Sequence, residues 1–171
     1  MSRLRRLENT EKIFYITYCL NRGQASFIEP GYQLLAQSIA TARERRDFRL
    51  SAFVFMPDHW HALIRPRPGD SIGRILPTIK VTFTFRQKRS IDLTLRRLKL
   101  GWQPRFWDSF IRSVGVFHAK ADYIHQNPVR RGLARQAEEG PWSSIHSCGA
   151  AGPVVLSVDH EALPLDSQAR L

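Results

Sequence analysis

Cysteine is scarce in this chain of 171 residues, which has only Cys19 and Cys148. Two cysteines exclude a disulfide-rich scaffold and a four-sulfur zinc site, and we expect both to be reduced thiols in a cytoplasmic protein. No apolar run approaches the roughly 20 residues that a membrane-spanning helix needs, so we expect no membrane association. The basic N-terminus also lacks the apolar stretch of a secretory signal.

Sequence motifs of several common enzyme classes are absent as well. The chain has no zinc-protease helix motif, no phosphate-binding Walker loop and no glycine pattern for dinucleotides. The aromatic signature of the common RNA-binding sheet is missing too. His146 and Cys148 stand two apart, but no further residue near them completes a thiol catalyst.

Acidic residues are few, at 15 against 26 lysines and arginines, which gives a formal net charge of +11. Residues 65–112 hold 12 of these bases and only 3 acids. An excess of one sign in one stretch predicts a polyanionic partner, above all a nucleic acid. The alternative is a generic basic surface exposed to solvent.

Hydrophobic residues make up 43% of the chain, enough for a globular core. Four segments have the character of strands and three have helical spacing. The strands are expected at 13–19, 50–56, 59–65 and 102–112, and the helices at 32–46, 72–89 and 116–126. The short link at Pro57-Asp58 predicts an antiparallel hairpin, whereas 90–101 is either a loop or a continuation of the preceding helix.

This order of elements predicts an α+β fold, a ferredoxin-like two-layer sandwich with a central antiparallel sheet and helices on one face. Nothing marks a second domain. We expect a single domain over residues 1–148, followed by an irregular or weakly ordered tail at 149–171.

Two histidines on a predicted strand are the first candidate site. His59 and His61 are two apart, so both imidazoles emerge on one face while Trp60 points to the other. Two neutral imidazoles on one face can hold one divalent metal ion. The alternative is two partly exposed strand histidines with no ligand.

A second candidate lies far downstream, on a predicted helix. Tyr123 and Asn127 are four apart and therefore share a helix face. Asn127 offers an amide oxygen to a hard cation, and Tyr123 beside such an ion can attack phosphorus. His125 and Gln126 are competing donors that point elsewhere. Alternatively, Tyr123 is a core tyrosine and Asn127 caps the helix end.

Four blocks of the sequence fall in an order that is characteristic of one family. They are Phe55–Ile64 with the histidine pair, Trp102–Arg112, Tyr123–Leu133, and Pro141–Ser144. Together they resemble the REP-associated tyrosine transposases, relatives of the single-tyrosine HUH transposases of small bacterial insertion sequences. The resemblance covers about residues 12–147.

The resemblance implies roles for four residues. His59, His61 and Asn127 match the ligands of a divalent metal, Mg²⁺ or Mn²⁺, and Tyr123 matches the nucleophile. Such enzymes nick single-stranded DNA, keep the 5′ end as a phosphotyrosine and leave a free 3′-OH. Relatives recognise hairpins of repetitive extragenic palindromes, with a short tetranucleotide 5′ of the stem. One departure is Asp58, where asparagine is common.

The predicted activity is therefore metal-dependent nicking and rejoining of single-stranded hairpin DNA, by a monomer or a homodimer. A non-catalytic hairpin binder with the same fold is the alternative, and an RNA-binding module is a weaker one. The predicted DNA contacts are basic and aromatic side chains of residues 65–112: Arg65, Arg67, Arg74, Lys80, Arg86, Lys88, Arg89, Arg96, Arg97, Trp102, Arg105 and Trp107.

Overall fold

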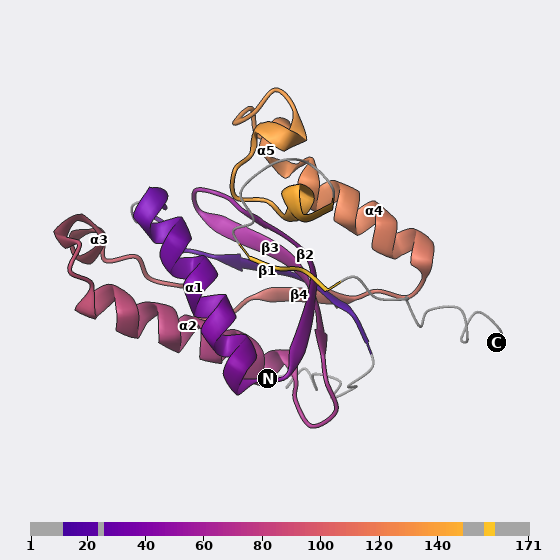
Figure 1. Ribbon diagram of the computed structural model, residues 1–171, viewed down its shortest axis with the longest axis horizontal. Coiled ribbons are helices and arrows are strands. Elements are labelled where there is room, and N and C mark those ends of the chain that lie inside the picture. Colours follow the sequence, from indigo (N-terminus) through magenta and orange to yellow (C-terminus); the bar gives the residue numbers. More distant parts are fainter. Residues whose placement is uncertain (1–11, 24–25, 149–155, 160–171) are drawn as a thin grey trace.

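The computed structural model describes residues 12–23, 26–148 and 156–159 (Figure 1). The strands are β1 (Phe14–Cys19), β2 (Phe48–Phe55), β3 (His59–Pro66) and β4 (Trp107–Phe110). The helices are α1 (Glu29–Arg45), α2 (Ile72–Arg89), α3 (Leu93–Leu98), α4 (Val114–His125) and α5 (Asn127–Arg130), with short 3₁₀ turns η1 (Ala137–Glu139) and η2 (Ser144–Cys148).

The four strands form one antiparallel sheet in the order β2-β3-β1-β4. The predicted β2–β3 hairpin is confirmed, with the pairing running from Phe48–Pro66 to Phe55–Trp60. The register shifts between Leu50 and Ala52, where a bulge adds one residue to β2. Thr17 of β1 stands between His61 of β3 and Trp107 of β4, so these three residues form one row across the sheet.

Helices cover both faces of this sheet (Figure 1). On one face, α1 and α2 enclose the main core with side chains such as Leu35, Trp60 and Phe83. On the other face, α4 packs through Ile124 onto a smaller cluster that includes Leu63. The predicted α+β sandwich with its central antiparallel sheet is confirmed, but the placement of all helices on one face was wrong.

The need for a helix on the second face of the sheet follows from the composition of β3. Every residue of this strand except Arg65 is buried, so both of its faces need a neighbouring layer. A strand with one face in water alternates apolar and polar residues instead. The apolar residues of α4, of which Ile124 is buried, supply the cover that the second face requires.

The predicted bounds of one helix and one strand differ clearly from the structure, whereas those of another helix agree. Helix α1 begins at Glu29 and not at Tyr32, because Pro30 occupies its first turn, where a proline is well tolerated. The predicted strand 102–112 is ordered as a strand only at β4, and Trp102 makes an isolated bridge with Leu20. Helix α2 has its predicted bounds, with Pro77 inside it.

Part of the predicted tail lies within the described residues. Leu156 is buried against the main core, and the Asp159 carboxylate accepts two hydrogen bonds from Arg43 of α1, at 2.8 and 3.0 Å. The remainder of the predicted tail, residues 149–155 and 160–171, lies outside the described residues. Among the helices that the structure describes, none is long and apolar enough to cross a membrane.

Candidate active site

The histidine pair of β3 is the centre of the site. His59 and His61 face the α4 side of the sheet, while Trp60 between them is fully buried in the opposite core, as the strand periodicity predicts. The two Nε2 atoms lie 3.1 Å apart, and each histidine is only 5% exposed. The Nε2 atoms of both histidines therefore face one position between the sheet and α4.

The other ring nitrogen of each histidine is held by a hydrogen bond. Nδ1 of His59 lies 2.6 Å from Oδ1 of Asp58. An ionised carboxylate only accepts, so this Nδ1 carries a proton, and in the neutral ring the lone pair of His59 is then on Nε2. Partial burial acts to raise the pKa of Asp58, but the hydrogen bond and charge of His59 hold it below its usual value.

The partners of His61 are two hydroxyls of β1. Its Nδ1 lies 2.8 Å from Thr17 Oγ1 and 2.9 Å from Tyr15 Oη. A hydroxyl both donates and accepts, so this pair of residues serves either tautomer of His61. Without a cation, Nε2–H of His61 can donate to Nε2 of His59; with the proton moved to Nδ1, both Nε2 lone pairs are free to bind.

His61 is neutral at physiological pH. Burial, together with the nearby positive charge that His59 can carry, lowers the pKa of His61 to about 3. Neutral imidazole is the form that binds metal ions. The environment therefore keeps His61 in its ligating form well below pH 7.

These residues fit a divalent cation. Two nitrogens 3.1 Å apart can both lie about 2.1 Å from one ion, at an angle of roughly 95°, near the 90° between adjacent octahedral positions. Within the described residues, no three His, Cys, Asp or Glu side chains are grouped to hold a metal.

Helix α4 brings Tyr123 to the histidines. The ring centroid of Tyr123 lies 5.8 Å from that of His61 and 6.2 Å from that of Tyr15. Tyr123 is half-buried, so its ring is held by packing while part of it stays accessible. The candidate nucleophile and the candidate ligand pair, distant in sequence, are thus in one site.

Asn127 lies one helical turn beyond Tyr123 and is 3% exposed. The sequence predicts that the helix ends before Asn127, and this was wrong in part. Gln126 interrupts α4 for a single residue, and its N–H still donates to Asp122 O at 2.9 Å. The chain then continues as α5, in which Pro128 occupies the first turn. Tyr123 and Asn127 therefore keep the one-turn separation that the prediction assumes.

Two cations stand beside the tyrosines, and the sequence reasoning missed them. Lys120 Nζ lies 4.5 Å from the Tyr15 ring centroid and 5.5 Å from that of Tyr123. The guanidinium carbon of Arg130 lies 5.1 Å from the Tyr123 ring centroid. Their spacing of three before and seven after Tyr123 is the signal that could have found them, because such positions share a helix face.

A family model described as "Transposase IS200 like" matches residues 12–127, which include the whole sheet, the histidine pair and Tyr123. The chain belongs to the IS200-like transposase family. It is 30% identical over 153 residues to the REP-associated tyrosine transposase of Escherichia coli K12, covering 89% of this chain and 87% of that protein. It is 26% identical over 152 residues to a putative REP-associated tyrosine transposase of Haemophilus influenzae, covering 85% and 86%. The resemblance seen in the sequence is confirmed, and the protein is an enzyme of the tyrosine transposase type.

Two solved structures share the fold of this transposase. A REP-associated tyrosine transposase bound to a REP hairpin superposes with a TM-score of 0.73 at 26% identity, over 96% of each chain. A putative transposase from Deinococcus radiodurans has a TM-score of 0.51 at 16% identity, covering 74% of this chain and 97% of that one, which shows the fold alone.

The predicted DNA contacts of the transposase separate into different regions. Trp102 was wrong as a platform for bases: it is 4% exposed and packs among the rings of Tyr18, Phe27 and Phe83. Trp107, in contrast, is 57% exposed and meets the Tyr15 ring edge-on, with centroids 5.7 Å apart. Trp107 thus presents an exposed indole in the same row of the sheet as His61.

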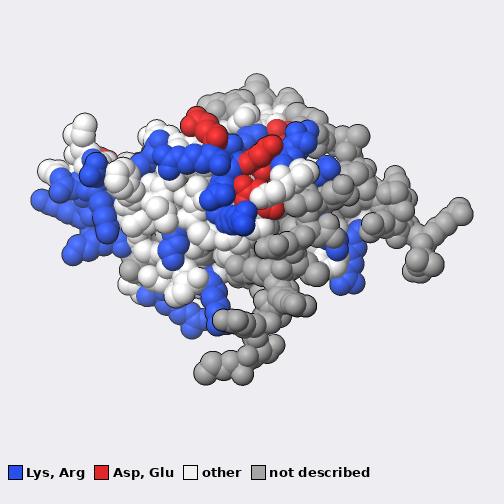
Figure 2. All heavy atoms as spheres, turned by 90° about the horizontal axis from the view of Figure 1, so that it is seen from below, with Lys and Arg blue, Asp and Glu red and all other residues white. Residues whose placement is uncertain are grey.

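Most of the predicted basic contacts lie away from the histidine pair. Figure 2 shows Lys and Arg gathered at the α3 end of the molecule, where Lys88, Arg89, Arg96 and Arg97 are exposed. Arg74, Lys80 and Arg86 are on α2, in the layer on the opposite face of the sheet from the histidines, and Arg65 and Arg67 follow at the far end of β3. Arg105 is exposed and lies two residues after Gln103, whose N–H donates to the carbonyl of Cys19, the partner of His59 in the sheet.

Proposed function

We propose that this transposase is a metal-dependent single-stranded DNA endonuclease and strand transferase that nicks and rejoins hairpin DNA through Tyr123. The observation that carries the proposal is the half-buried Tyr123 ring 5.8 Å from His61, whose Nε2 converges with that of His59. A nucleophile, two nitrogen ligands and nearby cations are what transfer of a phosphodiester requires.

In the proposed reaction, the Tyr123 oxygen attacks the scissile phosphorus and the phenolic proton leaves to solvent. The bond from phosphorus to the 3′ oxygen breaks, and that oxygen takes up a proton to become a free 3′-OH. The 5′ end stays on the protein as a phosphotyrosine. Because one phosphodiester replaces another, attack by a 3′-OH reverses the step and rejoins DNA without ATP.

His59, His61 and the Asn127 amide are the proposed ligands of Mg²⁺ or Mn²⁺. When bound there, the cation polarises the scissile phosphate as a Lewis acid. Asp58, Thr17 and Tyr15 hold the two imidazoles in position, as hydrogen-bonded partners of metal-binding histidines generally do. Lys120 and Arg130 are placed to neutralise phosphate charge next to the attacking phenol.

DNA hairpins are the proposed substrate. The relative of known structure is bound to a REP hairpin, and this chain matches it over 96% of its length. The formal net charge of +11 suits a polyanion, and binding by phosphate contacts is strongly dependent on salt. Exposed Trp107, Arg105 and the basic residues of α2 and α3 are the proposed contacts, with buried Trp102 removed from the predicted set.

A denaturing-gel assay tests the proposal. A labelled single-stranded hairpin oligonucleotide is incubated with Mn²⁺ or Mg²⁺ and the wild type, Tyr123→Phe or Tyr32→Phe. Tyr32 is the matched control, since it is also half-buried but lies on α1 beyond the sheet. We expect a metal-dependent covalent band that only Tyr123→Phe abolishes. A band that survives in Tyr123→Phe means another nucleophile, and tight binding without any band across several hairpins favours a non-catalytic hairpin binder.

A further inference from the structure

A tight turn directly follows α5, the helix that begins with Asn127. Gly132 has a φ of 67°, the left-handed conformation that glycine favours, and its N–H donates to the Val129 carbonyl at 2.9 Å. The N–H of Leu133 donates to the Pro128 carbonyl, also at 2.9 Å. These two bonds form a Schellman motif, which ends the helix and fixes the direction in which the chain leaves it.

The chain after this turn is held as well. The N–H groups of Arg135 and Gln136 both donate to Oε2 of Glu139, at 2.7 and 3.4 Å. Hydrogen bonds therefore fix the backbone on both sides of Leu133. In a Schellman motif the residue at this place commonly packs against the last turn of the helix, yet Leu133 is 56% exposed. The turn thus presents a large apolar surface to solvent in a set position.

Two consecutive arginines of this segment carry positive charge to the candidate active site. The guanidinium carbon of Arg130 lies 5.1 Å from the Tyr123 ring centroid. Burial and the charge of His59 are the main causes that lower the pKa of His61, and the charge of Arg131 lowers it further. Arg131 is exposed, and within the residues that the structure describes it forms no ion pair. Its charge is therefore available to an anion beside the histidines.

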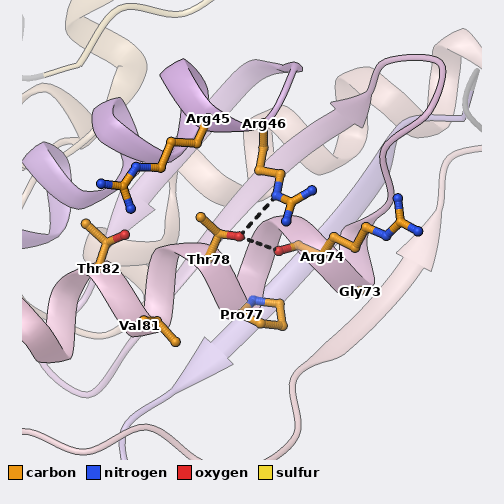
Figure 3. Close-up of a pocket in the computed structure, with 8 residues that line it drawn as sticks. All are labelled: Arg45, Arg46, Gly73, Arg74, Pro77, Thr78, Val81 and Thr82. Atoms are coloured by element: carbon orange, nitrogen blue, oxygen red, sulfur yellow. Dashed lines mark hydrogen bonds between the residues drawn. The ribbon is translucent and has the colours of Figure 1, made fainter.

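Other arginines of the molecule lie in the opposite layer. Arg45, Arg46 and Arg74 line a cleft of about 700 Å³ between α1 and α2. Figure 3 shows Arg46 there with its hydrogen bond to Thr78. The sheet separates that cleft from Tyr123, whereas α5 and α4 lie on the same face of the sheet (Figure 1). The turn after α5 is thus on the correct face to contact a strand that is bound at Tyr123.

The chemistry of Arg131 and Leu133 indicates the class of ligand. A guanidinium matches phosphate oxygens, and leucine is one of the apolar side chains that proteins pack against DNA bases. Two residues of chain span at most about 7 Å, so both side chains can reach one nucleotide. A phosphate next to an apolar base face is what a nucleotide of an unpaired strand presents.

We propose that the turn after α5 holds a nucleotide next to the scissile phosphate, with Arg131 on its phosphate group and Leu133 packed against its base. This inference rests on the proposed function and adds two substrate-binding residues to it. Neither side chain takes part in breaking or forming a bond. Packing of the base restricts the strand, which keeps the scissile phosphorus in reach of the Tyr123 oxygen. Because an apolar contact has no hydrogen-bonding pattern, it contributes position and little sequence preference.

The test measures binding in a Tyr123→Phe background, so that the result does not depend on cleavage. The probes are a fluorescent DNA hairpin with an unpaired flank and a series in which one flank nucleotide at a time lacks its base. Leu133→Ala is compared with Leu93→Ala, because Leu93 is 57% exposed but lies on α3, away from α5 (Figure 1). We expect about a tenfold loss of affinity in Leu133→Ala and no loss in Leu93→Ala. At one flank position, the missing base should abolish the effect of Leu133→Ala.

Losses that stay independent at every abasic position overturn the proposal, because Leu133 then contacts no base. An equal loss in Leu93→Ala also overturns it, since the effect is then one of general surface apolarity. Leu133→Met keeps an apolar side chain and should retain most of the affinity, which separates loss of the contact from damage to the turn. Coupling to one base in a protein that never forms a covalent band would uphold this site while the proposed catalysis fails.

The phosphate contact has its own measurement. Arg131→Ala should lower the slope of log affinity against log salt by about 0.7 on an unpaired strand, as expected for the loss of one contact. Arg135→Ala removes the same charge four residues further along the chain and should leave this slope unchanged. Equal changes in the two variants would show an effect of net charge and would refute the role of Arg131.

Discussion

Acidification should unfold this transposase partly through one side chain, His61. Burial and the charge of His59 lower its pKa to about 3, whereas an unfolded histidine titrates near 6.5. Between these values the unfolded chain binds a proton that the folded protein excludes, so stability is present above about pH 6.5 and is lost as the pH falls. One pKa unit corresponds to about 1.4 kcal/mol, and integration from pH 7 to pH 5 gives a loss of about 2 kcal/mol from this group.

Guanidinium chloride unfolding at pH 7 and pH 5, with a chelator to exclude metal ions, measures this effect. The comparison is between the wild type and His61→Gln, which does not titrate. Groups away from His61, such as His125 with its pKa lowered by burial, contribute to both proteins and cancel in the difference. The wild type should lose about 2 kcal/mol more than the variant over this interval. Equal losses would mean that His61 takes up its proton in the folded protein, which contradicts its burial beneath α4.

Two further pairs of substitutions test the core and the site. Trp102→Ala should lower the free energy of unfolding by about 3–5 kcal/mol, because it empties a buried aromatic cluster, whereas Trp107→Ala at the exposed position should cost about 1 kcal/mol or less. Urea titration measures both, and equal costs would refute the assignment of Trp102 to the core. Asp58→Ala should weaken Mn²⁺ binding about 10- to 100-fold in calorimetry, while Asp58→Asn keeps most of the affinity because its amide oxygen still accepts from His59 Nδ1. Identical losses in the two variants would show that the hydrogen bond is not the cause.

Local patterns predicted most of the elements, and the errors lie where packing overrides them. Helix α2 was predicted with its observed bounds, since apolar spacing from Ile72 onward is a property of the segment itself. Trp102 was misplaced because an aromatic residue next to a basic run has the same local pattern in a core as at a DNA surface. Its burial depends on the rings of Tyr18 in β1, of Phe27 just before α1, and of Phe83 in α2.

The sequence alone determined which residues share a face within one element. His59 and His61 must emerge together from any strand, and Tyr123 and Asn127 from any helix, because these periods come from backbone geometry. Only the tertiary structure decided that Tyr123 meets the histidine pair. That depends on α4 covering the face of the sheet opposite α1 and α2, and on the β1–β3 register that sets Thr17 opposite His61. Such contacts arise from burial between segments distant in the chain, which no local pattern encodes.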